Sequence, residues 1–503
     1  MSSTITERWL HRILLSLALL LCVMRFVSLK ADFPNHSPWI LDQAKFTDEG
    51  WWASGAVRHT VIGHWQVAGD YNPAVAVPVW PLLLTAVFHF TGASVVAARA
   101  VSVSFSIATV GLVYLLVRRY GGAPQTAALA ALLLAASPFA FAFSRLATLD
   151  TVVVFEFCLL LFIASYAGPH HCWPLATLGL LIPITLLTKT TALVLLPAVL
   201  WLVGGASVCM APVGVIKDKR LLRTMVVACA IPCAIAGAVM GIYLSLISRS
   251  IYAEDYHYFF DINAMAEVEL RNTPSYLLQL LQHGMWIDRI LYPAAMVVLV
   301  MSLLWLRQLW KNPLFTAAWI AFAGEAIFIL RRQDDYAPRY FLAMLVPLIL
   351  VLVLTLEELR TSKRIPASLL AAVLAVAAIL NTFTVFGFLR HRQYQFIDAA
   401  KSIRAIVNGE PNTHRLLLGS SADQLSLMTG VPSINDGYTS LELDKKALRY
   451  QPGWYIGWND LDQDILADLT AYRLDKVATY RVFDHPERNL LTLYRMVPVE
   501  PAP

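Results

Sequence analysis

The feature that most constrains this fold is a series of long apolar runs across residues 1–390 of the 503-residue chain. Residues 340–356 and 366–389, for example, contain no charged side chain. A helix needs about 20 apolar residues to cross the hydrocarbon core of a bilayer. Inside that core every backbone N–H and C=O must find its partner within the protein, and a helix achieves this within one segment. The runs therefore predict a mainly α-helical protein that crosses a membrane several times.

The overall composition supports an integral membrane protein. Hydrophobic residues make up 58% of the chain and charged residues 15%, whereas soluble domains have about 45–50% and about 25%. Because such a chain cannot cover a water-facing surface, we exclude disordered, collagen-like and nucleic-acid-binding proteins. The six cysteines lie in or beside apolar segments, and they indicate neither a disulfide framework nor a cysteine–histidine metal site.

The apolar runs predict about eleven transmembrane helices. The first, at 13–30, has the alternative interpretation of a secretory signal peptide, but its length and the spans that follow favour an anchor helix. The further spans are expected at 95–117, 125–142, 152–168, 173–187, 191–206, 224–247, 289–308, 313–330, 340–356 and 366–389.

The positions of lysine and arginine predict the orientation in the membrane. Basic residues in short loops favour the cytoplasmic side, and the basic clusters fit a cytoplasmic N-terminus. This orientation places the loops 31–94 and 248–288 outside, together with the tail 391–503. Charged residues are about twice as frequent in the tail as before it. We therefore expect a membrane domain at 1–390 and a soluble extracytoplasmic domain at 391–503.

The tail alternates short apolar runs with polar segments. Runs at 414–420, 477–483 and 490–496 predict strands, and 422–429 predicts a helix. A small α/β or α+β domain is the expected result. Neither an internal repeat nor the two-half symmetry of many transporters is evident along the chain.

Two adjacent carboxylates, Asp48 and Glu49, stand in the first outer loop beside Trp51 and Trp52. An apolar wall disfavours the charged form of a carboxyl group, which suits it to act as a base near neutral pH. Flat tryptophan faces suit a sugar ring or a lipid head group. The alternative interpretation is structural: the start of an interfacial helix with its tryptophans in the membrane-interface belt.

Two further outer segments contain candidate residues. Tyr71 and Asn72 begin a proline-punctuated stretch that cannot form one regular helix and that suits the lining of a cavity. Arg145 and Asp150 lie on an outer connection between two spans, where buried charge is costly and either functional or paired. For the first segment the alternative is a simple interfacial connection, and for the second an ion pair that holds the loop.

Cations stand at two other outer turns. Lys189 occupies a tight turn, where it either extends toward water or provides a positive charge for a phosphate. Arg339 and Tyr340 end an arginine-rich loop, which an anionic ligand or local pairing with acidic residues would explain. Asp48 and Asp150 are also candidates to share a divalent metal ion, and the sequence leaves metal dependence undefined.

These motifs occur together in one order along the chain. They are Asp48-Glu49, the stretch Tyr71–Pro81, residues 90–94 leading to Arg99, the segment from Arg145 to Asp150, Lys189, and Arg339-Tyr340 with Pro347. The combination resembles the integral-membrane C-type glycosyltransferases that use polyprenyl-phosphate sugars. The nearest groups are the lipid A aminoarabinose transferases and the protein O-mannosyltransferases. One position departs from the aminoarabinose group, since Asn72 stands beside Pro73 where a lysine is usual.

The resemblance implies an enzyme and a role for each motif. Asp48 would be the base of an inverting transfer, Glu49 would position it, and Asp150 would be a second acid. Arg58, Lys189, Arg339 and Tyr340 would hold the lipid phosphate, and Trp51, Trp52, Tyr71, Asn72 and Arg145 would line the substrate pocket. The implied partners are a polyprenyl-phosphate-linked sugar donor, a glycan, lipid or protein acceptor, and membrane lipids, without nucleic acid.

Other functions remain open at this stage. A lipid-linked sugar transporter or flippase is one alternative, and an oligosaccharide polymerase or ligase is another. Compact loops favour a bacterial inner membrane over an endoplasmic-reticulum membrane. The sequence leaves the sugar, the acceptor and the oligomeric state undefined.

Overall fold

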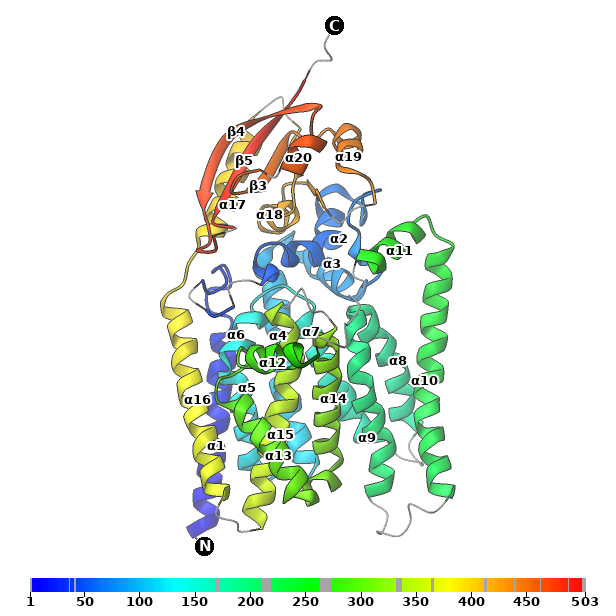
Figure 1. Cartoon of the computed structure of the whole chain (residues 1–503), viewed down its shortest axis with the longest axis vertical. Helices are drawn as coiled ribbons and strands as arrows, with labels where there is room; N and C mark the ends of the chain where they lie inside the picture. Colours follow the sequence, from blue (N-terminus) through cyan, green and yellow to red (C-terminus); the bar gives the residue numbers. More distant parts are fainter. Residues whose placement is uncertain are drawn as a thin grey trace.

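The structure is a computed structural model. It describes residues 2–35, 37–39, 42–167, 172–209, 219–262, 273–331, 337–362, 366–410, 414–437, 440–461, 463–486 and 488–499. The protein is an elongated helical bundle with a small sheet domain at one end, and its two termini lie at opposite ends of the long axis (Figure 1).

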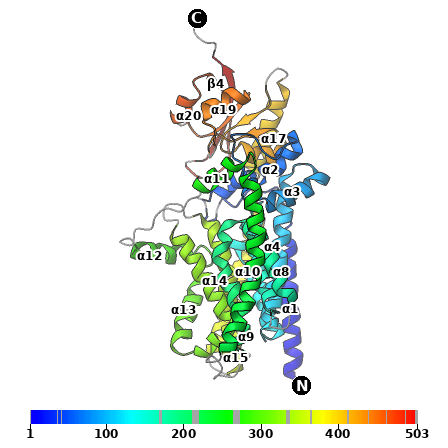
Figure 2. The same cartoon turned by 90° about the vertical axis from the view of Figure 1, so that its right-hand side faces the viewer.

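Long, roughly parallel helices form the bundle (Figures 1 and 2). They are α1 (Ser2–Met24), α4 (Val95–Arg119), α5 (Pro124–Ala136), α7 (Asp150–Ala164), α8 (Cys172–Thr188), α9 (Leu196–Cys209), α10 (Lys219–Ser248), α13 (Leu291–Leu304), α14 (Pro313–Leu330), α15 (Leu342–Thr361) and α16 (Pro366–Arg390). α15 lies at the centre and is buried on nearly all sides. It contacts α14, α5, α13, α16 and α7, so the core is one continuous apolar cluster.

Shorter helices cross the bundle toward the end that carries the sheet domain (Figure 1). They are α2 (Asp48–Ile62), α3 (Val79–Thr91), α6 (Pro138–Ser144), α11 (Ala253–Ile262) and α12 (Thr273–Gly284). Short 3-10 helices occur in the connections between helices: η1 (Gln43–Lys45), η2 (Pro73–Val75), η3 (Thr190–Leu195), η6 (Arg307–Lys311) and η7 (Pro338–Phe341). α2 is the interfacial helix that was the alternative interpretation of this loop; it begins at Asp48 and ends where Gly63 adopts a left-handed φ of 80°.

A proline and a buried arginine define the bend between α5 and α6. The two helices meet at 58°, because Pro138 has no N–H to continue the hydrogen bonds of α5. The side chain of Arg25, fully buried, fills the gap. Its guanidinium donates to the carbonyl groups of Leu134 at 3.0 Å and Ala135 at 3.1 Å. α1 is thereby tied to the outer end of α5.

The C-terminal domain holds a five-stranded mixed sheet with the strand order β2-β1-β3-β5-β4. The strands are β1 (Leu417–Leu418), β2 (Ser433–Ile434), β3 (Trp454–Trp458), β4 (Tyr472–Arg481) and β5 (Leu490–Pro498). Its helices are α17 (Gln395–Gly409), α18 (Ala422–Thr429), α19 (Leu443–Tyr450) and α20 (Gln463–Asp468). β1 pairs in parallel with β2 and β3, and β5 pairs antiparallel with β3 and β4.

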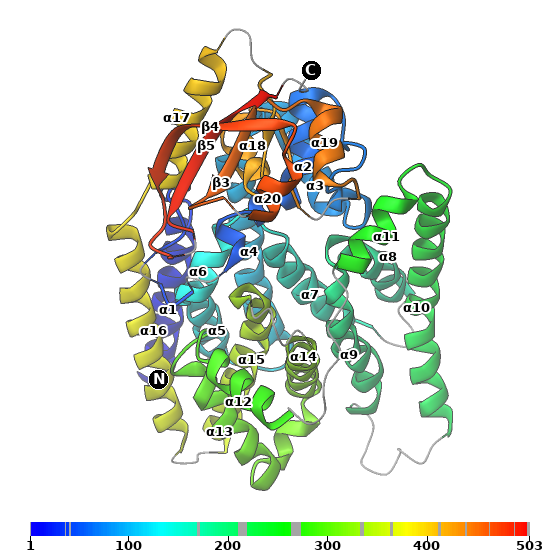
Figure 3. The same ribbon diagram turned by 45° about the horizontal axis from the view of Figure 1, so that its top comes forward.

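The C-terminal domain rests on the interfacial helices, with α18 packed against α2 (Figure 3). Gly50 makes this close approach possible, since an added Cβ would lie 2.2 Å from the backbone nitrogen of Gln424. The start of α2, where the candidate carboxylates stand, is therefore enclosed between the bundle and the tail.

The predicted fold class is confirmed: a mainly helical chain with a small α/β domain at its C-terminal end. Among the described residues, five helices are long and apolar enough to cross a membrane. α5 and α6 make a sixth if the bent pair is one span. The count of about eleven spans stays a prediction. Part of the predicted outer loop 248–288, residues 263–272, lies outside the described residues.

Candidate active site

Asp48, the first residue of α2, lies in a buried cluster of opposite charges. The Arg339 guanidinium bridges two carboxylates, with Nη1 2.8 Å from Asp42 Oδ1 and Nη2 2.8 Å from Asp48 Oδ2. Asp42 also accepts the backbone N–H of Arg339 at 2.8 Å, and the Thr47 hydroxyl donates to Asp48 Oδ1 at 3.0 Å. Burial raises the pKa of the Asp48 carboxyl, and the opposing effect of Arg339 does not cancel it.

The Asp48 carboxylate has an ion-pair partner and still has capacity to accept a proton. Oδ2 is buried and lies 2.8 Å from the Arg339 guanidinium, in an ion pair whose geometry is not that of a hydrogen bond. The two oxygens of a carboxylate have about four acceptor positions between them. Asp48 is therefore able to accept a proton from a substrate hydroxyl while it faces Arg339.

The second acid and the second cation lie beside this cluster. Asp150, the first residue of α7, forms an ion pair with Lys189 from the turn after α8. The Lys189 ammonium lies 5.1 Å and the Arg339 guanidinium 4.9 Å from the centre of the Tyr340 ring. The Asp150 charge contributes to raising the pKa of Asp48, so the two carboxylates interact. The structure thus brings together residues that lie far apart in the sequence.

Both cations face a cavity of about 320 Å³. Its wall is mostly aromatic and aliphatic, and is formed by Trp52, Val77, Leu149, Lys189, Thr190, Thr191, Leu193, Val194, Phe259, Phe260, Phe328, Arg339 and Tyr340. Among the described residues, the cavity combines apolar walls with two adjacent positive charges. This combination suits a ligand with a lipid chain and a phosphate.

The residues of this cluster do not form a favourable metal site. Within the described ranges, no three histidine, cysteine, aspartate or glutamate residues gather as ligands. Asp48 and Asp150 each already face a protein cation, Arg339 and Lys189 respectively. A divalent ion would have to displace these cations, so we assign it no step in the chemistry.

Glu49 lies in a different environment from its neighbour. Its side chain is fully buried, and Arg99 binds it through two hydrogen bonds of 2.7 and 2.6 Å. The backbone N–H of Ala147 donates to Oε1 at 2.8 Å, and the Gln424 amide donates to Oε2 at 2.9 Å. Gln424 in turn accepts the N–H of Gly50 at 2.7 Å. With both oxygens engaged, Glu49 fixes α2 between the bundle and the tail.

Arg58, which the family resemblance suggests for phosphate binding, is engaged by buried carboxylates. Its Nη2 lies 2.6 Å from Asp70 and 3.4 Å from Asp423 in the tail. Asp70 also binds the buried Lys446 ammonium at 2.8 Å. The pKa of Arg58 is raised, because these two carboxylates outweigh the effect of its burial. The structure places Arg58 in the contact between α2 and the tail, outside the wall of the cavity.

The aromatic candidates divide between the cavity and its support. Trp52 lines the cavity. Trp51 donates its indole N–H to the carbonyl of Ser420 at 2.9 Å and packs against Tyr71 at 5.3 Å. Tyr71 stacks on Phe259, which lines the cavity, with the ring centres 6.4 Å apart. Trp51 and Tyr71 thus support the cavity from the side of the tail.

Asn72 and Arg145 lie outside the cavity wall. The Asn72 amide donates to the Val67 carbonyl and to Asp255, each at 2.8 Å, so it holds its own loop together. Arg145 donates to the Ser28 carbonyl at 2.8 Å and lines a different cleft. Their predicted place in the substrate pocket stays a prediction.

Sequence reasoning did not select three residues that shape the site. Asp42 stands in the same outer loop as Asp48, so a third acid beside the pair was visible as a signal. Asp423 and Gln424 stand in the tail, far along the chain from α2. No local pattern links them to α2, because their partners become evident only when the tail folds onto the bundle.

Comparison with known proteins supports the family resemblance and the fold. Residues 73–212 match the family described as dolichyl-phosphate-mannose-protein mannosyltransferase, and no curated protein matches the chain by sequence. The crystal structure of ArnT from Cupriavidus metallidurans in the apo state superposes with a TM-score of 0.59 at 14% identity, covering 98% of each chain. The structure of that protein bound to undecaprenyl phosphate gives a TM-score of 0.57 at 14% identity, over 96% of this chain and 97% of the other. The resemblance inferred from the sequence is therefore confirmed: this multi-pass membrane protein has the fold of ArnT and matches the mannosyltransferase family over residues 73–212.

Proposed function

We propose that this chain is an inverting glycosyltransferase that moves a sugar from a polyprenyl-phosphate donor to an acceptor hydroxyl at the outer face of a bacterial inner membrane. The observation that carries the proposal is that the buried Asp48 carboxylate forms an ion pair with Arg339, which lines one apolar cavity together with Lys189. A base and a phosphate clamp are what such a transfer needs. The similarity to a structure that contains undecaprenyl phosphate supports the donor class.

The reaction is a single displacement. The acceptor hydroxyl gives its proton to Asp48 Oδ2 while its oxygen forms a bond to the anomeric carbon. The bond from that carbon to the phosphate oxygen breaks, and the polyprenyl phosphate leaves with the electron pair. Attack on the face opposite the leaving group inverts the anomeric centre. Positioned general-base catalysis of this kind contributes about 10²–10⁴-fold to a rate.

The charges of the cluster support this order of events. Before transfer, Arg339 faces the carboxylates of Asp42 and Asp48. When Asp48 accepts the proton it becomes neutral, which leaves one side of the guanidinium to stabilise the departing phosphate. Lys189 stands beside Tyr340 at the same cavity and provides a second positive charge.

The test is transfer by the purified protein in liposomes, supplied with a panel of polyprenyl-phosphate sugars. The wild type is compared with Asp48→Asn and with Asp398→Asn, which changes an exposed tail carboxylate by the same single atom. We expect wild type and Asp398→Asn to consume one donor, and Asp48→Asn to lose about 10²–10⁴-fold in rate. Equal rates for all three proteins would remove Asp48 as the base. Movement of an unconverted donor across the membrane would indicate a transporter.

A further inference from the structure

A second cavity, which the proposed reaction does not use, lies on another side of the molecule. Its volume is about 520 Å³, and it is enclosed by the loop at 37–39, α6, the turn from α12 to α13, and α16. Its larger apolar side chains are Trp39, Phe139, Trp286, Ile287, Leu380 and Phe388. We call it the α16 chamber. It shares no lining residue with the cavity beside Asp48.

The α16 chamber opens to the lipid-facing side of the bundle. α16 lies at the edge of the bundle (Figure 1) and passes the length and composition requirements of a membrane span. Leu380, on the chamber wall, is 51% exposed, and its helix neighbour Phe383 is 70% exposed. Exposed side chains of this kind on a span face acyl chains rather than water. An apolar space with such an opening is accessible to a chain from the membrane.

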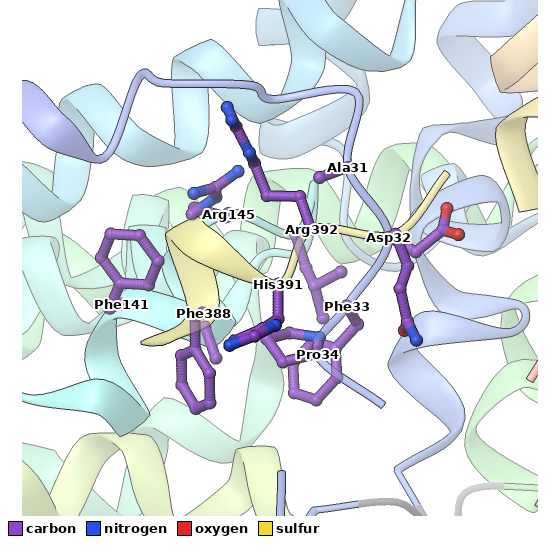
Figure 4. Close-up of a pocket in the computed structure, with 12 residues that line it drawn as sticks. Ala31, Asp32, Phe33, Pro34, Phe141, Arg145, Phe388, His391 and Arg392 are labelled. Atoms are coloured by element: carbon purple, nitrogen blue, oxygen red, sulfur yellow. The ribbon is translucent and has the colours of Figure 1, made fainter. Parts of the chain in front are cut away.

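The outer end of the α16 chamber meets a narrow cleft that carries positive charge. His391 and Phe388 line both spaces, and Arg145 and Arg392 line the cleft. Figure 4 shows the guanidinium groups of these two arginines on one side of the cleft and the Asp32 carboxylate turned to the other. We call the cleft, with Arg145, His391 and Arg392, the basic cleft.

The two arginines of the basic cleft have no carboxylate partner among the described residues. Both donate to Ser28, Arg145 to its carbonyl oxygen at 2.8 Å and Arg392 to its hydroxyl. Burial, followed by the neighbouring charge of Arg99, lowers the pKa of Arg145 to about 10, and Arg392 adds to this effect. Two positive charges on one serine repel each other, and an anion would relieve that repulsion.

The carboxylates nearby already have other roles. Asp32 accepts the backbone N–H of Phe396 at 3.0 Å, and burial raises its pKa to about 6. Asp288, on the wall of the α16 chamber, accepts the N–H groups of Ile290 and Leu291 at 2.7 Å and so caps α13. Neither group neutralises the arginines. The apolar chamber and the basic cleft together therefore complement a ligand with an acyl chain and an anionic head.

We propose that the α16 chamber and the basic cleft bind an anionic phospholipid of the outer leaflet, one whose head group carries a phosphate and a net negative charge, at a site separate from the donor cavity. An acyl chain fills the α16 chamber between Trp39, Trp286 and Phe388. The phosphate lies at the basic cleft, where Arg392 and His391 face its opening and Arg145 adds charge from behind. The site does not depend on the proposed transfer reaction, since the two cavities have separate walls.

Gly387 provides a direct test, because it lines the α16 chamber and an added Cβ would meet no atom within 4 Å. The Cβ of Gly387→Phe therefore lies in open space at the chamber wall, and its ring takes up part of the chamber volume. Gly241→Phe is the matched control, since Gly241 lies on α10, away from the chamber, and its added Cβ also meets nothing within 4 Å. The double variant Arg145→Gln/Arg392→Gln removes the charge and keeps the chamber. Native mass spectrometry of the full chain measures retained phosphatidylglycerol against phosphatidylcholine with the same acyl chains.

We expect wild type and Gly241→Phe to retain phosphatidylglycerol about tenfold more tightly than phosphatidylcholine, because both lipids carry the phosphate but the quaternary ammonium of choline is repelled by the two arginines. Gly387→Phe should lose both lipids, and the double arginine variant should bind the two equally. Melting temperatures in the same detergent establish that each variant is folded. Undiminished phosphatidylglycerol on Gly387→Phe, or a preference unchanged without the arginines, would overturn the proposal. Neither result bears on sugar transfer, which is measured separately.

Discussion

Asp48 and Glu49 are adjacent in the first turn of α2, but the partners of their two carboxylates differ sharply. Around Asp48, the carboxylate has one ion pair with Arg339 and one hydrogen bond from Thr47, and both cations of the cluster line a cavity. Around Glu49, Arg99, Ala147 and Gln424 engage both carboxylate oxygens. Both groups are buried charges, but only the first leaves a position for a substrate.

Under the proposed mechanism, this difference separates a catalytic arrangement from a structural one. A fully paired buried carboxylate contributes to stability only while its partners remain, and removing one partner leaves a costly unpaired charge. A partly paired carboxylate can change its protonation state without breaking the fold. We therefore expect substitutions around Glu49 to lower the free energy of unfolding, and substitutions around Asp48 to lower the reaction rate.

The largest effect on stability is expected from Arg99→Leu. It leaves the Glu49 carboxylate buried without its bidentate partner and should lower the free energy of unfolding by about 3–5 kcal/mol. The measurement is thermal unfolding in a fixed detergent. The control is the double variant Glu49→Gln/Arg99→Leu, which removes the unpaired charge and should recover part of the loss. A double variant no more stable than Arg99→Leu would contradict the pairing.

A smaller effect, on activity, is expected from Lys189→Gln. Its ammonium pairs with Asp150 and faces the donor cavity. Loss of one charge-assisted contact with the phosphate should lower kcat/KM by about 10–100-fold, which corresponds to about 1.5–3 kcal/mol. Lys445→Gln, at an exposed tail position, is the control. An unchanged kcat/KM in Lys189→Gln would remove the lysine from the phosphate clamp.

Gly50→Ala is expected to affect stability less than Arg99→Leu. Its Cβ would lie 2.2 Å from the backbone of α18, so the tail must shift away from α2. Overpacking of this kind costs about 1–3 kcal/mol. Gly63→Ala is not a matched control because of its positive φ, whereas Gly111→Ala adds a methyl group into open space on α4. Equal melting temperatures for the Gly50 and Gly111 variants would contradict the close contact between α2 and α18.

The smallest effect is a shift of the pH profile in Thr47→Val. The Thr47 hydroxyl donates to Asp48 Oδ1 and so lowers the pKa of that carboxyl. Without it the pKa rises, and because the base acts only when deprotonated, the acidic limb of kcat/KM moves to higher pH. The shift should be under about one pH unit, the equivalent of one neutral hydrogen bond. A shift toward lower pH would contradict the role of Asp48.

The sequence predicted the features that depend on local pattern. Runs of apolar residues revealed the bundle, and the helix from Asp48 and the tail helix at 422–429 were both predicted and found. The predicted strand at 414–420 is found as the shorter β1, Leu417–Leu418, whose two residues pair with β2 and β3. The strand β3 was not predicted, since its run of Trp454–Trp458 is short and follows a glycine.

The candidate site was only partly accessible to such reasoning. Asp48, Asp150, Lys189, Arg339 and Tyr340 were selected as outer-face charges and aromatics, and the structure brings them together. The sequence alone could not assign different roles to Asp48 and Glu49. Their roles differ because α4, the loop before α7 and the tail provide the partners of Glu49.

The most direct test of this account compares Asp48→Asn with Glu49→Gln in single-turnover transfer, with rates expressed per folded molecule. Both changes replace one oxygen of a buried carboxylate with an amide. The account predicts that Asp48→Asn retains its melting temperature and loses about 10²–10⁴-fold in rate, whereas Glu49→Gln loses stability and keeps a rate near that of wild type. The reverse pattern, with the rate lost in Glu49→Gln and kept in Asp48→Asn, would contradict it.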